Sequence, residues 1–166
     1  QTTKVMKIRI HQPLMKVALA CAAVAAVLST QAAQRTWTGG GADGNWNTPA
    51  NWDTGVPVSG DSVLMSGSTR RFNTNNIVGL VLSGIGYNGS VVFATAGNSI
   101  SNTGGIYVTT GGHTNALAWT LGNAQAFTND AAGTFFILSG AITNAGNKLT
   151  VGGAGSVWLN GVVLGG

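Results

Sequence analysis

The stretch that decides the fold class of this chain is Leu149-Thr150-Val151-Gly152-Gly153-Ala154-Gly155-Ser156-Val157-Trp158-Leu159-Asn160-Gly161. Two short runs of apolar and β-branched residues are separated by four small residues, and the second run ends at an Asn-Gly step. Val and Thr favour strands, whereas Gly clusters and Asn-Gly favour tight turns. The stretch therefore predicts short strands joined by tight turns, without a helix.

The same alternation continues back toward the N-terminus, and no segment of the intervening chain has helical periodicity. We expect strands at Ser62–Met65, Ile77–Leu82, Ser90–Ala94, Ile106–Thr110, Leu117–Leu121, Thr134–Leu138, Leu149–Val151 and Ser156–Leu164. We expect turns at Gly84–Gly89, Ala96–Gly105, Gly111–Asn115, Gly122–Gly133, Ser139–Asn147 and Gly152–Gly155. Strands at near-regular spacing predict an all-β protein.

Among the all-β folds, a sandwich, a barrel and a solenoid remain open, and three features favour the solenoid. The strands are short, the turns are rich in Asn, Gly and Thr, and only 7% of residues are charged. Similar phrases also recur, in each of which an apolar and a polar residue precede a glycine. They are Leu82-Ser83-Gly84, Leu138-Ser139-Gly140 and Leu159-Asn160-Gly161. We interpret them as one corner used repeatedly.

The N-terminal segment has the pattern of an export leader. A basic region ends at Lys16, residues 17–28 are apolar, and residues 29–33 are mostly small. The apolar run is short for a bilayer span. We therefore predict a helical signal peptide at residues 1–33, cleaved after Ala32 or Ala33; the alternative is a retained membrane anchor.

The charge and cysteine content place further limits on function. Although the formal net charge is +4, four of the eight cations precede residue 17. The remaining cations and the aspartates balance from residue 34 onward, so nucleic-acid binding is not expected. The single cysteine, Cys21, has Ala18 rather than Leu three residues before it, which argues against lipidation. A mature chain without cysteine has to be stabilised by backbone pairing and packing.

A second distinctive stretch precedes the strands and contains three of the five tryptophans. The candidate binding residues are Trp37, Trp46, Trp52, Asp43, Asn45 and Asp53. The tryptophans could stack on sugar rings while the polar residues supply hydrogen bonds. Alternatively, the bulky rings could cover the open end of the solenoid. We favour this second role, which makes residues 34–69 an N-terminal cap and residues 70–166 the solenoid.

These motifs resemble the autotransporter-associated β-strand repeat proteins of bacteria. The head motif includes Thr36–Gly39, Asp43–Trp46, Asn51–Asp53 and Gly60–Val63, and Leu138–Ile142 followed by Lys148–Gly161 resembles the family's repeat. The resemblance implies a secreted or surface-displayed passenger, such as an adhesin, at the outer membrane. It also implies a right-handed β-helix. Because Leu164-Gly165-Gly166 offers no polar end, we expect further rungs in the natural protein.

The remaining motifs do not favour catalysis. Asp43-x-Asn45-x-Asn47 has the spacing of calcium ligands, but Thr48 and Thr54 occupy positions where a calcium loop has Gly and an acid. We therefore assign Asp43 to a turn and expect no metal and no cofactor. His113 is interpreted as a solvated turn residue, and Phe135, Phe136, Tyr107 and Trp119 are interpreted as residues of the solenoid core. Acid–base catalysis on a polysaccharide needs paired groups, and we expect no enzyme.

The sequence thus predicts a structural or adhesive β-helical protein without catalytic activity, exported to the cell surface or beyond it. The alternative is a β-sandwich carbohydrate-binding module that uses the tryptophans as its platform. Surface glycans, or other copies of the chain through solenoid stacking, are the expected partners. We expect no nucleic acid, and no membrane contact by the mature segment.

Overall fold

A computed structural model describes residues 32–165, which form one compact unit. The predicted signal peptide lies outside the described residues except for Ala32 and Ala33. Its helix and its cleavage therefore stay predictions. Among the described residues the only helix is the 3-10 turn η1 (Pro49–Asn51).

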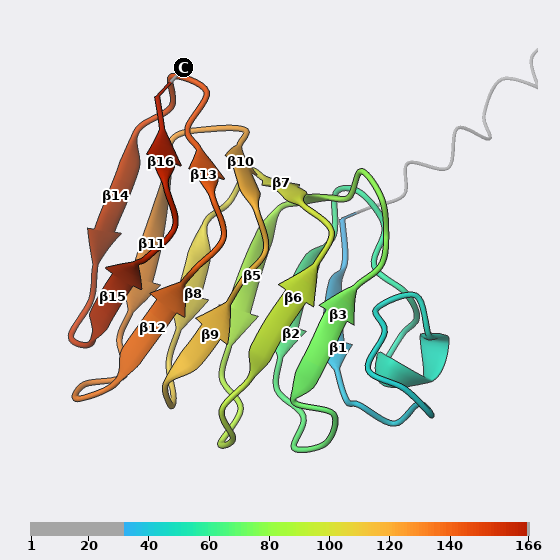
Figure 1. Ribbon diagram of the computed structural model, residues 1–166. Helices are drawn as coiled ribbons and strands as arrows, with labels where there is room; N and C mark the ends of the chain where they lie inside the picture. The colour runs from blue at the N-terminus through green and yellow to red at the C-terminus, as the bar shows by residue number, and fades with distance from the viewer. Residues whose placement is uncertain (1–31, 166) are drawn as a thin grey trace, which may run out of the picture. The chain divides into compact units, whose positions relative to one another are not determined.

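The described strands form three parallel sheets that wind into a β-solenoid of about five turns (Figure 1). Sheet A contains β1 (Gln34–Trp37), β2 (Ser62–Met65), β5 (Gly84–Tyr87), β8 (Ile106–Val108), β11 (Gln125–Asn129) and β14 (Leu149–Gly152). Sheet B contains β3 (Phe72–Asn75), β6 (Ala94–Gly97), β9 (His113–Asn115), β12 (Phe135–Leu138) and β15 (Ser156–Leu159). Sheet C contains β4 (Val81–Leu82), β7 (Ile100–Asn102), β10 (Trp119–Leu121), β13 (Ile142–Thr143) and β16 (Val163–Leu164). The predicted all-β solenoid is confirmed, and the sandwich is excluded because these strand pairs are all parallel.

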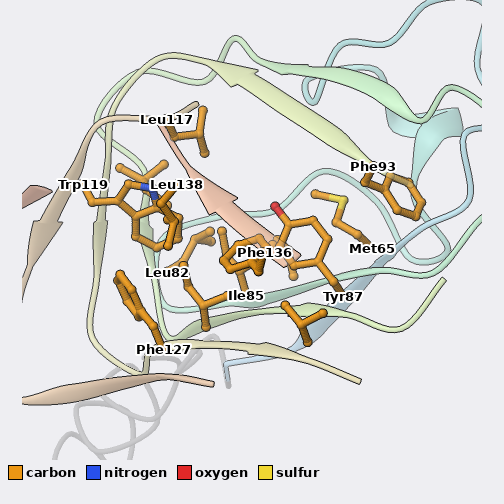
Figure 2. Close-up of a cluster of buried hydrophobic side chains, with 14 of the residues drawn as sticks. Met65, Leu82, Ile85, Tyr87, Phe93, Leu117, Trp119, Phe127, Phe136 and Leu138 are labelled. Carbon is orange, nitrogen blue, oxygen red and sulfur yellow. The ribbon is translucent and has the colours of Figure 1, made fainter. Parts of the chain in front are cut away.

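The core consists of columns of side chains that stack from one turn to the next. In sheet A, Val63 pairs with Ile85, Ile85 with Ile106, and Ile106 with Phe127. These four side chains are at most 2% exposed. Figure 2 shows residues of all three sheets meeting in this interior. Strict register therefore places like residues above one another, which buries a continuous apolar column.

Buried asparagines close the corners between sheets. Asn75, Asn115 and Asn129 are fully buried at the ends of β3, β9 and β11. In each, the side-chain oxygen accepts a hydrogen bond from the backbone N–H two residues later, at 2.9–3.2 Å. Such a bond turns the backbone by local means. The same local hydrogen bond thus changes the direction of the chain at three of its corners.

The recurring glycine phrases correspond to two different corners. Leu138 and Leu159 are register partners in sheet B, so Gly140 and Gly161 lie at the same corner of successive turns. A Cβ at Gly161 would overlap the carbonyl oxygen of Gly140, and one at Gly140 would overlap that of Leu117. Leu82, by contrast, ends β4 in sheet C. The prediction of a single repeated corner is therefore wrong for Leu82-Ser83-Gly84, and right for the other two.

Several predicted turns are strands. β5, β7, β9, β11 and β13 lie in segments that their Gly, Asn and Thr content assigned to turns. β1 and β3 were not expected as strands either, and the predicted strand Ser90–Ala94 overlaps β6 only at Ala94. Only β2 has the predicted bounds. Parallel pairing with the strands of neighbouring turns supplies these segments with hydrogen bonds that their local propensity does not reveal.

The aromatic residues divide between the inside and the outside of the solenoid. Trp119 and Phe136 are buried, as expected of core residues, but Tyr107 is 52% and Phe135 is 47% exposed. Their assignment to the core is wrong because successive side chains of a strand point to opposite faces. Tyr107 lies between two buried residues of β8, and Phe135 precedes buried Phe136.

Candidate functional site

The segment between β1 and β2, residues 38–61, is called here the head segment. It reaches the first turn of the solenoid at sheets B and C. The N–H of Thr74 in β3 donates to Gly44 O, and the Trp46 N–H donates to Thr74 O, both at 2.9 Å. Beside β4, the Gly60 N–H donates to Val81 O at 2.8 Å.

In sheet A, β1 covers the edge of the first turn. It pairs in parallel with β2 from Gln34 to Trp37. The outer edge of the first turn is thus hydrogen-bonded along all three sheets, by β1, by residues 44–46 and by residues 59–61. An uncovered edge strand would present unpaired N–H and C=O groups to other chains.

The three tryptophans of this region form one buried cluster. Trp37 and Trp46 are 0% exposed and Trp52 is 4% exposed. The Trp52 ring packs edge to face against both others, with centroids 5.1 Å from Trp37 and 5.6 Å from Trp46. Such aromatic pairs add stability beyond the apolar area that they bury. In this structure none of the three rings presents an open face to solvent.

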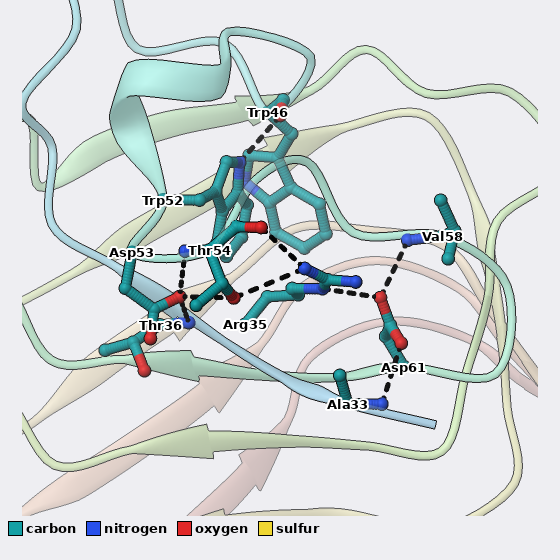
Figure 3. Close-up of polar contacts among 9 residues, drawn as sticks. All are labelled: Ala33, Arg35, Thr36, Trp46, Trp52, Asp53, Thr54, Val58 and Asp61. Carbon is teal, nitrogen blue, oxygen red and sulfur yellow. Dashed lines mark hydrogen bonds and ion pairs between the residues drawn. The ribbon is translucent and has the colours of Figure 1, made fainter. Parts of the chain in front are cut away.

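The indole N–H groups of the cluster differ in their partners. Trp46 Nε1 donates to Asn73 Oδ1 at 2.8 Å, and Trp52 Nε1 donates to Trp46 O at 2.7 Å. Figure 3 shows the second of these bonds. Trp37 Nε1 is buried and has no hydrogen-bond partner among the described residues. Two of the rings are therefore fixed in orientation by hydrogen bonds, and the third by packing.

Asn51 holds the head segment in its conformation. This buried residue of η1 accepts a hydrogen bond from the Gly41 N–H at 2.9 Å. Its amide group donates to Asp43 O and to Asn45 O, each at 2.9 Å. A single side chain thus satisfies three backbone groups of the loop that carries Trp46.

A charged pair joins β1 to the end of the head segment (Figure 3). Arg35 Nε donates to Asp61 Oδ2 at 2.8 Å, and the Arg35 guanidinium also donates to Thr54 O at 2.7 Å. The side chain of Asp61 is only 3% exposed. Burial opposes ionisation of Asp61, but hydrogen bonds from Ala33, Arg35 and Val58 outweigh it and lower its pKa.

The two other aspartates of the region serve their own loops. Asp43 accepts hydrogen bonds from the Asn45 N–H at 3.0 Å and from Thr48 Oγ1 at 2.7 Å, which confirms its predicted turn role. These bonds, that of Thr48 first, lower the pKa of Asp43. Asp53 Oδ1 accepts from the Thr36 N–H at 2.9 Å. Within residues 32–165, no three His, Cys, Asp or Glu residues form a group that could hold a metal ion.

The structure therefore brings the three predicted tryptophans together, whereas the predicted polar residues bond mainly to their own loops. Asp43 and Asp53 are exposed, and Asn45 is half-buried beside Thr74. Arg35, Asn51 and Asp61 were not among the site residues predicted from the sequence. Their signal was weak, because nothing local to these residues reveals partners that lie up to 26 positions away.

His113 is buried in β9, so its interpretation as a solvated turn residue is wrong. It is 1% exposed, and its Nδ1 accepts the Phe93 N–H at 3.0 Å. Nε2 lies 2.6 Å from Thr110 O and therefore carries the proton of a neutral imidazole. Burial, which outweighs the bond to Thr110, lowers the pKa of His113. The ring also stacks on Tyr87, with centroids 4.9 Å apart.

Arg70 and Arg71 lie between β2 and β3. Both are exposed. Arg70 donates to Gly39 O at 2.8 Å, and the Arg71 guanidinium lies 5.5 Å from the centre of the Phe72 ring.

A hollow of about 320 Å³ lies over the outer face of sheet A. Its lining includes Gly84, Gly86, Gly105, Tyr107 and Thr128. Among residues 32–165, no carboxylate, histidine, lysine or arginine lines it. It therefore offers an aromatic ring and hydroxyl groups, and no group that transfers protons near neutral pH.

Comparisons of this chain with protein-family models, curated proteins and solved structures find no match. Among residues 32–165, no helix has the length and apolar character needed to cross a membrane.

Proposed function

We propose that this chain forms an exported, structural β-solenoid displayed at the cell surface or released from it, and that β1 and the head segment cap the solenoid. The observation that carries the proposal is the coverage of the first turn. Hydrogen bonds from β1, Trp46 and Gly60 reach sheets A, B and C at their N-terminal edges.

The tryptophan cluster supplies the apolar half of such a cap. Trp37 is the first member of a column that continues through Met65, Tyr87 and Val108. Without Trp46 and Trp52, the start of this column would meet water. A buried tryptophan removes roughly 150–250 Å² from solvent, which corresponds to about 4–6 kcal/mol per ring at about 25 cal/mol per Å².

The composition supports an exported structural role. The only cysteine, Cys21, precedes the described residues, so ladders of backbone hydrogen bonds and the stacked core replace disulfides as the source of rigidity. Asn, Thr and Ser are frequent on the outside of the solenoid and suit contact with glycans or with other copies. The resemblance to autotransporter-associated repeat proteins agrees with this role and with right-handed winding.

A structural role also fits the distribution of ionisable groups better than a catalytic one. Beyond the head segment Asp130 is the only acidic residue of the sequence, and it is exposed. In the part of the chain that the structure describes, no proton-transferring side chain lines the hollow over sheet A. The alternative glycan platform would require the tryptophan rings to leave the core, which no observation favours.

The test compares two Trp→Ala variants of the same chain. Trp46→Ala removes a ring of the cluster, whereas Trp158→Ala removes a ring that is 47% exposed. We expect Trp46→Ala to aggregate or to lose near-UV circular dichroism, and Trp158→Ala to remain folded and monomeric by size-exclusion chromatography with light scattering.

Two results would contradict the capping role. A Trp46→Ala protein as stable and monomeric as Trp158→Ala would show that the ring is not needed at the end of the solenoid. A folded Trp46→Ala protein that no longer binds to a glycan array, while the parent binds, would instead establish the carbohydrate-binding role. Fractionation of a bacterial host that expresses the chain tests export separately, and retention in the cytoplasm would refute it.

A further inference from the structure

Ala33, the second described residue, is bonded to a buried carboxylate. Its N–H donates to Asp61 Oδ1 at 2.8 Å, and its carbonyl accepts the Ser62 N–H at 2.9 Å (Figure 3 shows the first). Ala32, one residue earlier, is exposed and makes no hydrogen bond to another of the residues 32–165. The contacts that join the N-terminal end of β1 to β2 therefore begin at the nitrogen of Ala33.

We propose that the leader is removed between Ala32 and Ala33, and that the α-ammonium group created at Ala33 forms an ion pair with Asp61 that fastens β1 to the first turn. This inference rests on the proposed export, because a leader peptidase on the export route would perform the cleavage. Hydrolysis consumes one water, so that Ala32 ends as a carboxylate and the nitrogen of Ala33 as an ammonium group.

The geometry distinguishes this cleavage position from the next one. Cleavage after Ala33 would remove both of its hydrogen bonds, leaving the Ser62 N–H and Asp61 Oδ1 without these partners. Cleavage after Ala32 keeps both bonds. It also replaces a neutral donor by a charged one, and charge-assisted hydrogen bonds are roughly twice as strong as neutral ones.

The surroundings of Asp61 suit a second cation. Its carboxylate has one cationic partner, Arg35, and it accepts a further neutral bond from the Val58 N–H at 3.1 Å. The side chain of Arg35 is 20% exposed, and Ala33 is half-buried. An ammonium group at Ala33 would therefore reach water while it faces a carboxylate that is almost fully buried.

The sequence before the bond is compatible with this position. Leader peptidases prefer small residues at the first and third positions before the cleaved bond. For cleavage after Ala32 these residues are Ala32 and Thr30, whereas for cleavage after Ala33 they are Ala33 and the larger Gln31. Sequence and structure thus select the same bond independently.

The first experiment determines the mature N-terminus. The full 166-residue chain is expressed in a bacterial host, and the exported species is analysed by intact mass and N-terminal sequencing. Ala33 as the first residue is the expected result. An exported protein that begins at Gln34 or at any other residue refutes the inference alone, whereas a chain that stays uncleaved in the cytoplasm refutes the proposed export together with it.

The second experiment tests the ion pair without export. Chains that begin at Ala33 or at Gln34 are made in the cytoplasm, with the initiating methionine removed, and each is also made with Asp61→Asn. We expect the Gln34 chain to have a Tm lower by more than about 5 °C. In the Asp61→Asn background this difference should shrink by half or more. An undiminished difference would show that Asp61 is not the partner, and equal Tm values of the two parent chains would refute the anchoring role.

Discussion

Replacing each tryptophan of the buried cluster by phenylalanine gives a test of the hydrogen bonding inferred for the head segment. Trp37→Phe, Trp46→Phe and Trp52→Phe remove the same atoms from three rings that are at most 4% exposed. The lost burial and the remaining cavity should therefore cost a similar amount at each site, about 2 kcal/mol.

The indole N–H makes the three substitutions unequal. Trp46→Phe leaves Asn73 Oδ1 without its 2.8 Å partner, and Trp52→Phe leaves Trp46 O without its 2.7 Å partner. Each unsatisfied buried acceptor adds about 1–3 kcal/mol. Trp37→Phe removes a buried donor that has no partner, which recovers about the same amount. We expect losses of about 3–5 kcal/mol for Trp46→Phe and Trp52→Phe, whereas Trp37→Phe should change the free energy of unfolding by no more than about 1 kcal/mol in either direction.

The assay is urea unfolding followed by far-UV circular dichroism, so that the changed number of tryptophans does not alter the signal. Trp158→Phe is the surface control and should change stability by less than about 0.5 kcal/mol. The reasoning fails if Trp37→Phe is as destabilising as Trp46→Phe. That outcome would mean that the Trp37 N–H has a partner in solution, or that packing alone determines the three losses.

Three further predictions concern buried polar residues of the solenoid. Burial lowers the pKa of His113, so the contribution of its neutral imidazole to the free energy of unfolding should be complete above pH 6.5 and decline as the pH falls below 6.5. The urea concentration at the unfolding midpoint should therefore decrease between pH 8 and pH 5. This decrease should be smaller in the His113→Phe variant. Burial raises the pKa of Tyr87 to about 12, so the contribution of its neutral phenol to the free energy of unfolding should be complete below pH 10 and lost as the pH rises toward 12. Thermal melts should show that the Tm of Tyr87→Phe falls less over this pH range than the Tm of the parent chain. An equal fall would contradict the assignment. Asn115→Ala should lower the free energy of unfolding by about 3 kcal/mol or more, because it leaves the Leu117 N–H and other buried groups unpaired. Asn98 is exposed, so Asn98→Ala should lower it by less than about 0.5 kcal/mol. Similar losses for the two variants would refute the role of buried asparagines in stabilising the corners.

The candidate site was only partly predictable from the sequence. The three tryptophans were identified because bulky aromatic residues are conspicuous in a chain of small polar ones. The pair between Arg35 and Asp61 was missed, since its members are 26 positions apart and the residues next to each one do not identify the other as its partner. The role of Asn51 was missed for a related reason. Its three bonds depend on the path of the whole loop, and an isolated Asn in a turn is compatible with many paths.

The sequence by itself determined the fold class of this protein. Short runs of β-favouring residues, Gly- and Asn-rich turns and few charges specify strands and tight corners, and together they favour a solenoid over a sandwich or a barrel. Local chemistry is sufficient for this conclusion, because turn residues and strand residues act through their own backbone.

Only the tertiary structure decided which residues face inward. Buried Asn115 and His113 look like turn residues in the sequence, whereas exposed Tyr107 and Phe135 look like core. The face of a strand depends on its register, and a shift by one residue exchanges the two faces. In this solenoid the register is determined by pairing with the preceding and following turns, roughly 20 residues away in the chain. That pairing exists only after the chain has folded, and it also brings Ala33 to Asp61.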